Sequence, residues 1–330
     1  MPQTRARHAA GFFIRFFCAA ALAALAGCAQ LVPQTISLRS AWPDGVARHS
    51  VIPNVPFFPQ EDYQCGPASL ATLLTFSGVN AKPDDLVPQV YLPSRHGSLQ
   101  LEMFSAPRRW GRVPYALAPR YQDLLREVAA GNPVLVLQDV GPMWTQWHYA
   151  VVYGFDYPSG TLYLRSGTKE VQEMPFTAFE REWMKSNYWA MVVTPPDRIP
   201  VTATENGWTA ATLAIAKTGD DVSALKAYQA ALKRWPDNLP AAIGLANQYH
   251  ARGQFPAAVA VLREAQKRNP QSVIVMNNLA QALSDQGRQE EALAQIDKAA
   301  ADPHSPFAGD VRSTRAMILG RMGRQTTGSR

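Results

Sequence analysis

The chain has 330 residues, of which 47% are apolar, and its formal net charge is +6 at pH 7. A chain of this length and apolar content can form a sizeable core if it divides into two domains. Its basic residues are spread along the sequence without a basic run, so nucleic-acid binding is not indicated.

The first segment has the pattern of a targeting sequence. Arginines precede an apolar run over residues 16–26, which is too short to span a bilayer comfortably. The run ends in Leu-Ala-Gly-Cys at Cys28, which resembles the lipobox of bacterial lipoproteins. The resemblance implies a lipoprotein signal peptide over residues 1–27 and acylation of Cys28; an uncleaved anchor is the alternative. Ala29, in place of Asp, favours the outer membrane facing the periplasm.

A lone cysteine begins a predicted helix in QEDYQCGPASLATLL, residues 60–74. Pro67 suits the first turn, and three leucines after it form a buried stripe, so the helix is expected to begin at Cys65. Unpaired N–H groups and the helix dipole favour a thiolate there. The other two cysteines, Cys18 and Cys28, lie in the targeting segment or at its end, so no disulfide partner is expected for Cys65. Cys65 is therefore a candidate nucleophile; the alternative is a small buried apolar residue at a helix start.

Two further residues complete the candidate site. Gln60 is close enough in sequence to Cys65 for its amide and the Cys65 N–H to donate to the same oxyanion. His49 falls in the entry segment and His96 in a loop, whereas His148 opens the alternating strand HYAVVYGFD. A histidine at a strand start can reach a helix N-terminus on the facing layer, so His148 is the expected base. A packed or surface histidine is the alternative.

Three stretches, QEDYQCGPASLATLL, AAGNPVLVLQ and HYAVVYGFD, together resemble a known family. They are similar to the peptidase domain of double-glycine leader (bacteriocin-processing) peptidases and their free-standing papain-like relatives. The resemblance covers residues 51–195 and implies an α+β papain-like cysteine peptidase domain that needs no cofactor and no metal. It implies Cys65 as nucleophile, His148 as base and Gln60 as oxyanion donor, with Gln64 as the weaker alternative for the last role.

The residue that orients His148 departs from this family. The family has an Asp on the strand after the histidine, where this chain reads LYLRSG. Asp156 is the nearest carboxylate in sequence, but eight residues of strand separate it from His148 by about 26 Å at roughly 3.3 Å per residue. We therefore expect no carboxylate to be hydrogen-bonded to the His148 imidazole.

The hairpin that follows offers hydroxyl groups instead. If DYPSG is its loop and Phe155 pairs with Thr161, then Thr168 opposes His148 and Ser166 is its diagonal neighbour. A hydroxyl or a backbone carbonyl would hold the tautomer without stabilising imidazolium as a carboxylate does, which predicts a slower or more specialised enzyme.

The sequence TPPDRIPVTAT, at residues 194–204, is the best domain boundary, because its prolines interrupt regular structure. Before it, β-branched and aromatic runs with Pro and Gly predict the α+β domain of residues 51–195, preceded by a tether over residues 28–50. Residues 196–204 are the predicted linker, and after them Ala, Leu and Gln recur at helical spacing.

The helical region repeats itself. Residues of one type recur 34 positions apart, as in Pro236 with Pro270 and Gly253 with Gly287. This period resembles the tetratricopeptide repeat and implies an all-α solenoid over residues 205–322, with a capping helix near 307–322 and a disordered tail over 323–330. Such arrays bind a protein partner on their concave face, so His250 and His304 are expected to be solvated or packed rather than catalytic.

Three classes of function remain. The leading one is an envelope-anchored cysteine peptidase acting on a peptide or protein substrate, with the repeats recruiting a substrate or partner. The second is an acyl transferase or amidase that uses the same Cys-His pair. The third is a non-catalytic scaffold that binds peptides.

Overall fold

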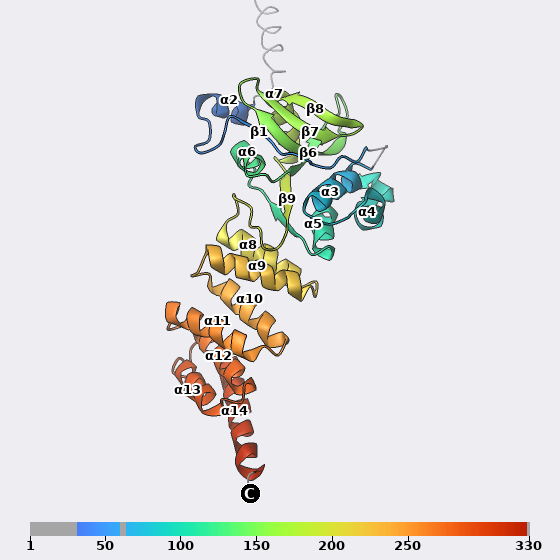
Figure 1. Cartoon of the computed structure of the whole chain (residues 1–330). Coiled ribbons are helices and arrows are strands. Elements are labelled where there is room, and N and C mark those ends of the chain that lie inside the picture. The colour runs from blue at the N-terminus through green and yellow to red at the C-terminus, as the bar shows by residue number, and fades with distance from the viewer. Residues whose placement is uncertain (1–31, 60–63, 329–330) are drawn as a thin grey trace, which may run out of the picture.

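The computed structural model describes residues 32–59 and 64–328, so the signal-peptide segment, Cys28 and Gln60 lie outside the described residues. A sheet domain is followed by a stack of helices that ends at the C-terminus (Figure 1). The first part is α+β and the second is all-α, as the sequence predicts.

An antiparallel sheet of seven strands forms the centre of the first domain. Its hydrogen-bonded order is β4 (Val113–Ala116), β9 (Ala190–Thr194), β5 (Val134–Asp139), β6 (Trp147–Asp156), β7 (Thr161–Ser166) and β8 (Lys169–Pro175). The short strand β1 (His49–Val51) pairs with the far end of β6, and β2 (Tyr91–Leu92) pairs with β3 (Gly97–Ser98) outside the sheet.

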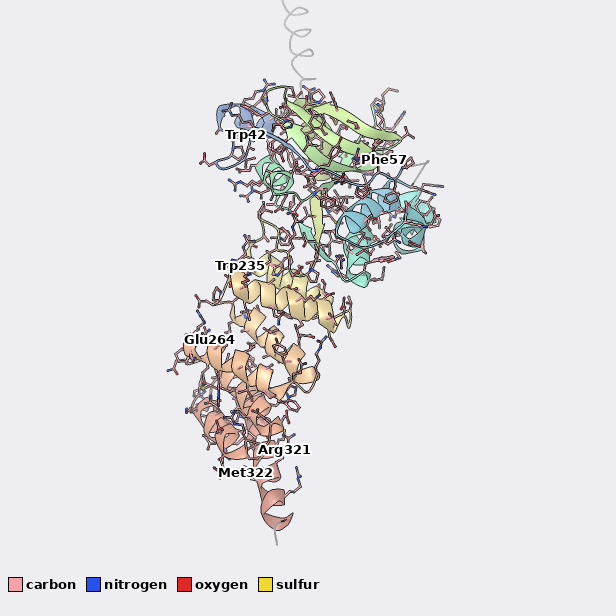
Figure 2. The ribbon with its side chains drawn as sticks, in the orientation of Figure 1. Trp42, Phe57, Trp235, Glu264, Arg321 and Met322 are labelled. Carbon is pink, nitrogen blue, oxygen red and sulfur yellow. The ribbon has the colours of Figure 1, made fainter. Side chains whose placement is uncertain are left out.

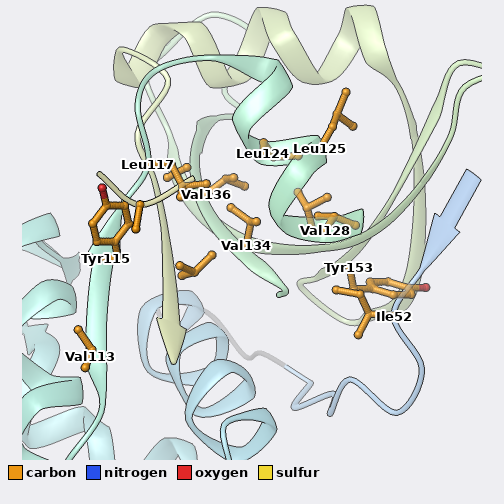
Figure 3. Close-up of a cluster of buried hydrophobic side chains, with 14 of the residues drawn as sticks. Ile52, Val113, Tyr115, Leu117, Leu124, Leu125, Val128, Val134, Val136 and Tyr153 are labelled. Carbon is orange, nitrogen blue, oxygen red and sulfur yellow. The ribbon is translucent and has the colours of Figure 1, made fainter. Parts of the chain in front are cut away.

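Helices cover both faces of this sheet. One face packs against α3 (Cys65–Phe76), α4 (Pro83–Val90) and α5 (Gln100–Arg109), the other against α2 (Pro33–Ser40), α6 (Tyr121–Ala129) and α7 (Phe176–Trp183). Short 3-10 turns occur at Pro93–Arg95 and Met184–Ser186. Figure 3 shows side chains of α6 beside Val134 and Val136 of β5, on the face away from α3.

The central strand β6 is buried along nearly its whole length. Its odd residues Tyr149 and Val151 contact the α3 side, and its even residues Ala150 and Val152 contact the α6 and α7 side. Alternate residues of β6 therefore pack into the two hydrophobic cores on opposite faces of the sheet, and neither set faces solvent.

The hairpin register differs from the expectation at its turn. Phe155 pairs with Leu162 instead of Thr161, because Asp156 is the last paired residue of β6. A β-bulge between Val152 and Gly154 then shifts the register by one residue. Because the bulge places one extra residue on β6, the pairing of β6 with β7 beyond it, toward His148, has the register that the sequence predicts.

The predicted tether is wrong for residues 32–50, which belong to the folded domain. Leu38 of α2 is buried in the core, and the Glu180 carboxylate of α7 accepts the backbone N–H groups of Gln34 and Thr35 at 2.9 and 2.6 Å. A carboxylate at a helix N-terminus satisfies N–H groups that have no partner within the helix. This long-range contact fixes α2 on α7.

Three helix pairs and a final helix make up the second part, as predicted. The pairs are α8 (Glu205–Ala216) with α9 (Asp221–Arg234), α10 (Leu239–Ala251) with α11 (Phe255–Arg268), and α12 (Val273–Asp285) with α13 (Gln289–Ala299). Each inter-helix glycine of the repeat, Gly219, Gly253 and Gly287, has a positive φ. His250 is hydrogen-bonded to Asp285, which agrees with a packed histidine.

The final helix α14 (Ala308–Gly328) extends beyond the predicted cap. The predicted disordered tail is therefore wrong for residues 323–328, which are helical. Arg321 and Met322 lie beside the last repeat (Figure 2), where Arg321 donates to Ser284 Oγ at 2.9 Å and pairs with Asp285. These contacts hold the helix at a point where the repeat pattern has ended.

The two parts share one hydrophobic core. Trp208 of α8 is fully buried in the same cluster as Tyr115 of β4 and Val136 of β5. The Tyr115 hydroxyl accepts the Thr204 N–H at 3.0 Å, and Arg234 donates to the Pro200 carbonyl at 2.8 Å. The predicted linker is thus a packed connection, and the first helix pair is fixed on the sheet domain.

Candidate active site

Cys65 is the first residue of α3, where the sequence places it. The helix is apolar and buried from Gly66 to Leu74, so the sheet and the neighbouring helices hold it in place. The backbone N–H groups of Tyr149, Gly66 and Cys65 itself lie close enough to the Cys65 sulfur to lower the pKa of the thiol. Because Tyr149 directly follows His148, the thiol lies near the strand that carries the expected base.

Close packing also fixes the helix start from the other side. A Cβ on Gly66 would lie 2.2 Å from Ser98 Oγ, so β3 approaches the helix only because this residue is glycine. Tyr149 Oη donates to the Ser98 carbonyl at 3.2 Å. Strand β3, the start of α3 and the start of β6 therefore form one packed unit around the thiol.

His148 is oriented by a hydroxyl group. Its Nε2 lies 2.9 Å from Ser166 Oγ on the adjacent strand, and Ser166 is buried. The bulge in β6 brings Ser166 to this position, diagonal to His148. In the tautomer whose Nε2–H donates to Ser166 Oγ, Nδ1 carries no proton and can accept one.

Burial dominates the electrostatics of both groups. It raises the pKa of the Cys65 thiol above its ordinary value, although N–H groups led by that of Tyr149 oppose the shift. It also lowers the pKa of His148. Desolvation therefore outweighs the N–H groups that favour a thiolate, and the thiol and the imidazole are both neutral near pH 7.

Cys65 and His148 line one cavity of about 1080 Å³. The segment from Ser94 to Leu99, the segment from Thr145 to Tyr149, and Gly167 line this cavity as well. His96, which the sequence placed in a loop, adopts a left-handed conformation with φ of 47° and also lines this cavity.

The remaining sequence candidates fall outside this group. Asp156 lies at the other end of β6, where it contacts His49 Nδ1 at 3.2 Å and accepts the Ser159 N–H. Gln64 is the half-buried N-cap residue of α3, and its side chain makes no capping hydrogen bond. Thr168 is exposed on the turn after Ser166.

Asp139 is a site residue that the sequence reasoning missed. It ends β5, and its Oδ1 accepts the N–H groups of Gly141 and Gln146 at 3.1 and 2.8 Å, which closes the loop before His148. Burial alone would raise its pKa, but these N–H groups and Lys185, 3.2 Å away, lower it. An Asp two residues before Gly in a turn was the available signal.

Within the described ranges, no group of three or more His, Cys, Asp or Glu side chains could hold a metal ion. No helix in these ranges is long and apolar enough to cross a membrane.

Comparison with known proteins divides the chain at the same place. Residues 52–191 match the Peptidase_C39 like family, and residues 217–266 and 243–306 match the tetratricopeptide repeat. No curated protein matches the chain.

Several solved structures are similar to one part or the other. A structure described as a C39-like peptidase from Bacillus anthracis is 18% identical, covers 44% of this chain and 97% of its own, and gives a TM-score of 0.38. The complex of the TPR2B domain of yeast Sti1 with pHsp70 is 20% identical, covers 36% and 97%, and gives 0.34. The first TPR of Spaghetti (RPAP3) bound to an HSP90 peptide is 15% identical, covers 36% and 93%, and gives 0.33. From its family matches, the chain carries a Peptidase_C39-like domain followed by tetratricopeptide repeats.

Proposed function

We propose that the chain is a cysteine peptidase in which Cys65 is the nucleophile and His148 the general base. The observation that carries the proposal is that Cys65 and His148 line one cavity, while the Tyr149 N–H lies close enough to the sulfur to lower the pKa of the thiol. A thiol at a helix start beside an oriented imidazole is the arrangement that nucleophilic attack on a carbonyl requires.

The reaction follows from the protonation states. His148 Nδ1 takes the thiol proton as the Cys65 sulfur bonds to the substrate carbonyl carbon, and the Cys65 N–H donates to the oxyanion. Collapse breaks the C–N bond, and the imidazolium returns the proton to the departing amine. Water, activated by the same imidazole, then hydrolyses the thioester and releases the acid and the thiol. Gln60 is the proposed second oxyanion donor.

Ser166 is the proposed orienting residue. In the proposed tautomer its Oγ accepts the Nε2–H, which leaves Nδ1 unprotonated, but a hydroxyl does not compensate the positive charge of imidazolium. The proton is therefore transferred only when substrate is attacked, which supports a slow or specialised peptidase.

The test uses the full-length chain with a peptide library and mass-spectrometric detection of new termini. Cleavage that is abolished in both Cys65→Ser and His148→Ala supports the proposal, because each variant removes one reacting group. Transfer of an acyl group to an added amine without net hydrolysis would identify a transferase. Peptide binding without turnover, unchanged in both variants, would identify a scaffold.

We also propose that acylated Cys28 anchors the protein to the bacterial outer membrane, facing the periplasm, and that the repeats recruit a protein partner. The lipobox-like sequence ending at Cys28 supports the anchor, and the concave surface typical of such repeats supports the partner. Globomycin treatment or Cys28→Ala should leave unprocessed or soluble protein; unchanged membrane fractionation after both would refute the anchor.

A further inference from the structure

Exposed apolar side chains gather at the mouth of the catalytic cavity. Two short segments that border it contain six of the large apolar side chains exposed in the described part of the chain: Leu99, Leu101, Val140, Met143, Trp144 and Trp147. Leu99 and Trp147 line the cavity itself. We call these six residues the apolar rim. Apolar residues gathered beside the thiol are a binding feature, because single exposed apolar residues would be scattered.

Val140, Met143 and Trp144 of the rim belong to the loop between β5 and β6, and hydrogen bonds fix the base of this loop. Val140 N–H donates to the Gln146 carbonyl at 3.0 Å, and the Asp139 carboxylate closes the loop from below. A Cβ on Gly141 would lie 1.7 Å from the Trp144 carbonyl oxygen, so the loop folds tightly only with glycine there. Its base is fixed while Met143 and Trp144 remain 82% and 80% exposed at its tip.

The cavity favours a polypeptide over a lipid chain. Its volume of about 1080 Å³ is slightly above that of pockets for small ligands, which span about 300–1,000 Å³, so several residues can enter. Its lining is mainly polar and includes Ser94, Thr145 and Gln146 beside the apolar Leu99 and Trp147. An extended peptide can bond these polar groups through its backbone, whereas an acyl chain would leave them without partners.

From this arrangement we infer the substrate class: an extended polypeptide segment with large apolar side chains next to the bond that Cys65 attacks. The apolar rim contacts these side chains, with Leu99 and Trp147 lining the cavity and Met143 and Trp144 at the tip of the loop. The inference rests on the proposed peptidase function and adds its specificity.

The experiment measures kcat/KM of the full-length chain on matched peptides that carry Leu or Phe, Ser, or Asp at positions flanking the scissile bond. Apolar residues should be preferred on the order of tenfold at one or more of these positions, as expected for an apolar subsite. The double variant Met143→Ser, Trp144→Ser and the single variant Leu101→Ser should each reduce this preference. Val222→Ser, an exposed valine on α9, is the matched control and should leave it unchanged.

Alkylation of Cys65 by iodoacetamide at pH 8 separates a failure of the proposed substrate class from a failure of the proposed peptidase function. Equal alkylation rates in all variants would show that the loop changes leave the thiol intact. Cleavage without an apolar preference, or a preference that survives the rim variants, would overturn the substrate class and leave the peptidase proposal standing. If no peptide of any sequence is cleaved by a chain whose Cys65 can still be alkylated, the proposed function itself fails. Rim variants that weaken binding to phospholipid vesicles while peptide selectivity stays unchanged would identify a lipid contact and overturn the inference.

Discussion

The Cys65 thiol is expected to become reactive at a lower pH when Ser166 is replaced by Asp. Ser166 Oγ lies 2.9 Å from His148 Nε2, and the side chain is buried, so the new carboxylate would face the imidazole directly. An opposite charge at this distance raises the pKa of a histidine by about 1–3 units, and a charged imidazolium in turn favours the thiolate. Ser166→Asp would thus convert a neutral pair into an ion pair.

The size of the effect follows from the two shifts. In the wild type, burial raises the pKa of Cys65, so its thiolate fraction at pH 7 is below the few per cent of a free thiol. Burial also lowers the pKa of His148, so the imidazole stays neutral into mildly acidic solution. Each unit by which the pKa of His148 rises corresponds to about 1.4 kcal/mol, which is a tenfold increase in the ion-pair population. Burial of the new carboxylate opposes part of this gain, so we expect a rise of about tenfold in alkylation rate at pH 6.

The assay is the iodoacetamide rate of Cys65 between pH 5 and 10, read by mass spectrometry. Wild-type reactivity should rise with pH until the raised pKa of the thiol is passed, whereas Ser166→Asp should show an added plateau at lower pH. Because the pKa of His148 rises in the variant, the acidic limb of its peptidase activity should move to higher pH. Thr168→Asp, on the exposed turn two residues away, is the matched control. Identical profiles for Ser166→Asp and the wild type would refute the reasoning.

Three further outcomes are expected. Gln60→Ala should lower kcat by roughly 10²-fold or more without changing the iodoacetamide rate, as loss of an oxyanion donor does, whereas Asp156→Ala should change little; equal losses in both would contradict the site. Glu180→Gln should lower the free energy of unfolding by about 1–3 kcal/mol in urea titration, because α2 loses its charged acceptor; an unchanged midpoint would refute that contact. The fragment 205–322 should show mainly helix by circular dichroism and melt below the full chain, since Trp208 loses its cover; substantial strand content would contradict the repeats.

The sequence alone was sufficient for features set by local pattern. The helix that begins at Cys65 follows from Pro67 and the leucines after it, and the strand that carries His148 near its start follows from the alternating pattern HYAVVYGFD. The 34-residue period predicted the helix pairs, because each repeat contacts mainly its neighbours and its sequence records those contacts. Ser166 was within reach because strand pairing relates residues by a simple register.

Only the tertiary structure decided what depends on contacts between distant residues. Residues 32–50 resembled a tether until Glu180 and the core of α7 were seen to hold α2. The bulge in β6, the closure of the loop by Asp139 and the burial of Trp208 against the sheet domain leave no periodic trace in the sequence. The protonation state of Cys65 was also decided by the tertiary structure. Its pKa depends on desolvation by all the elements packed around it, and this desolvation outweighs the effect of the N–H groups at the helix start.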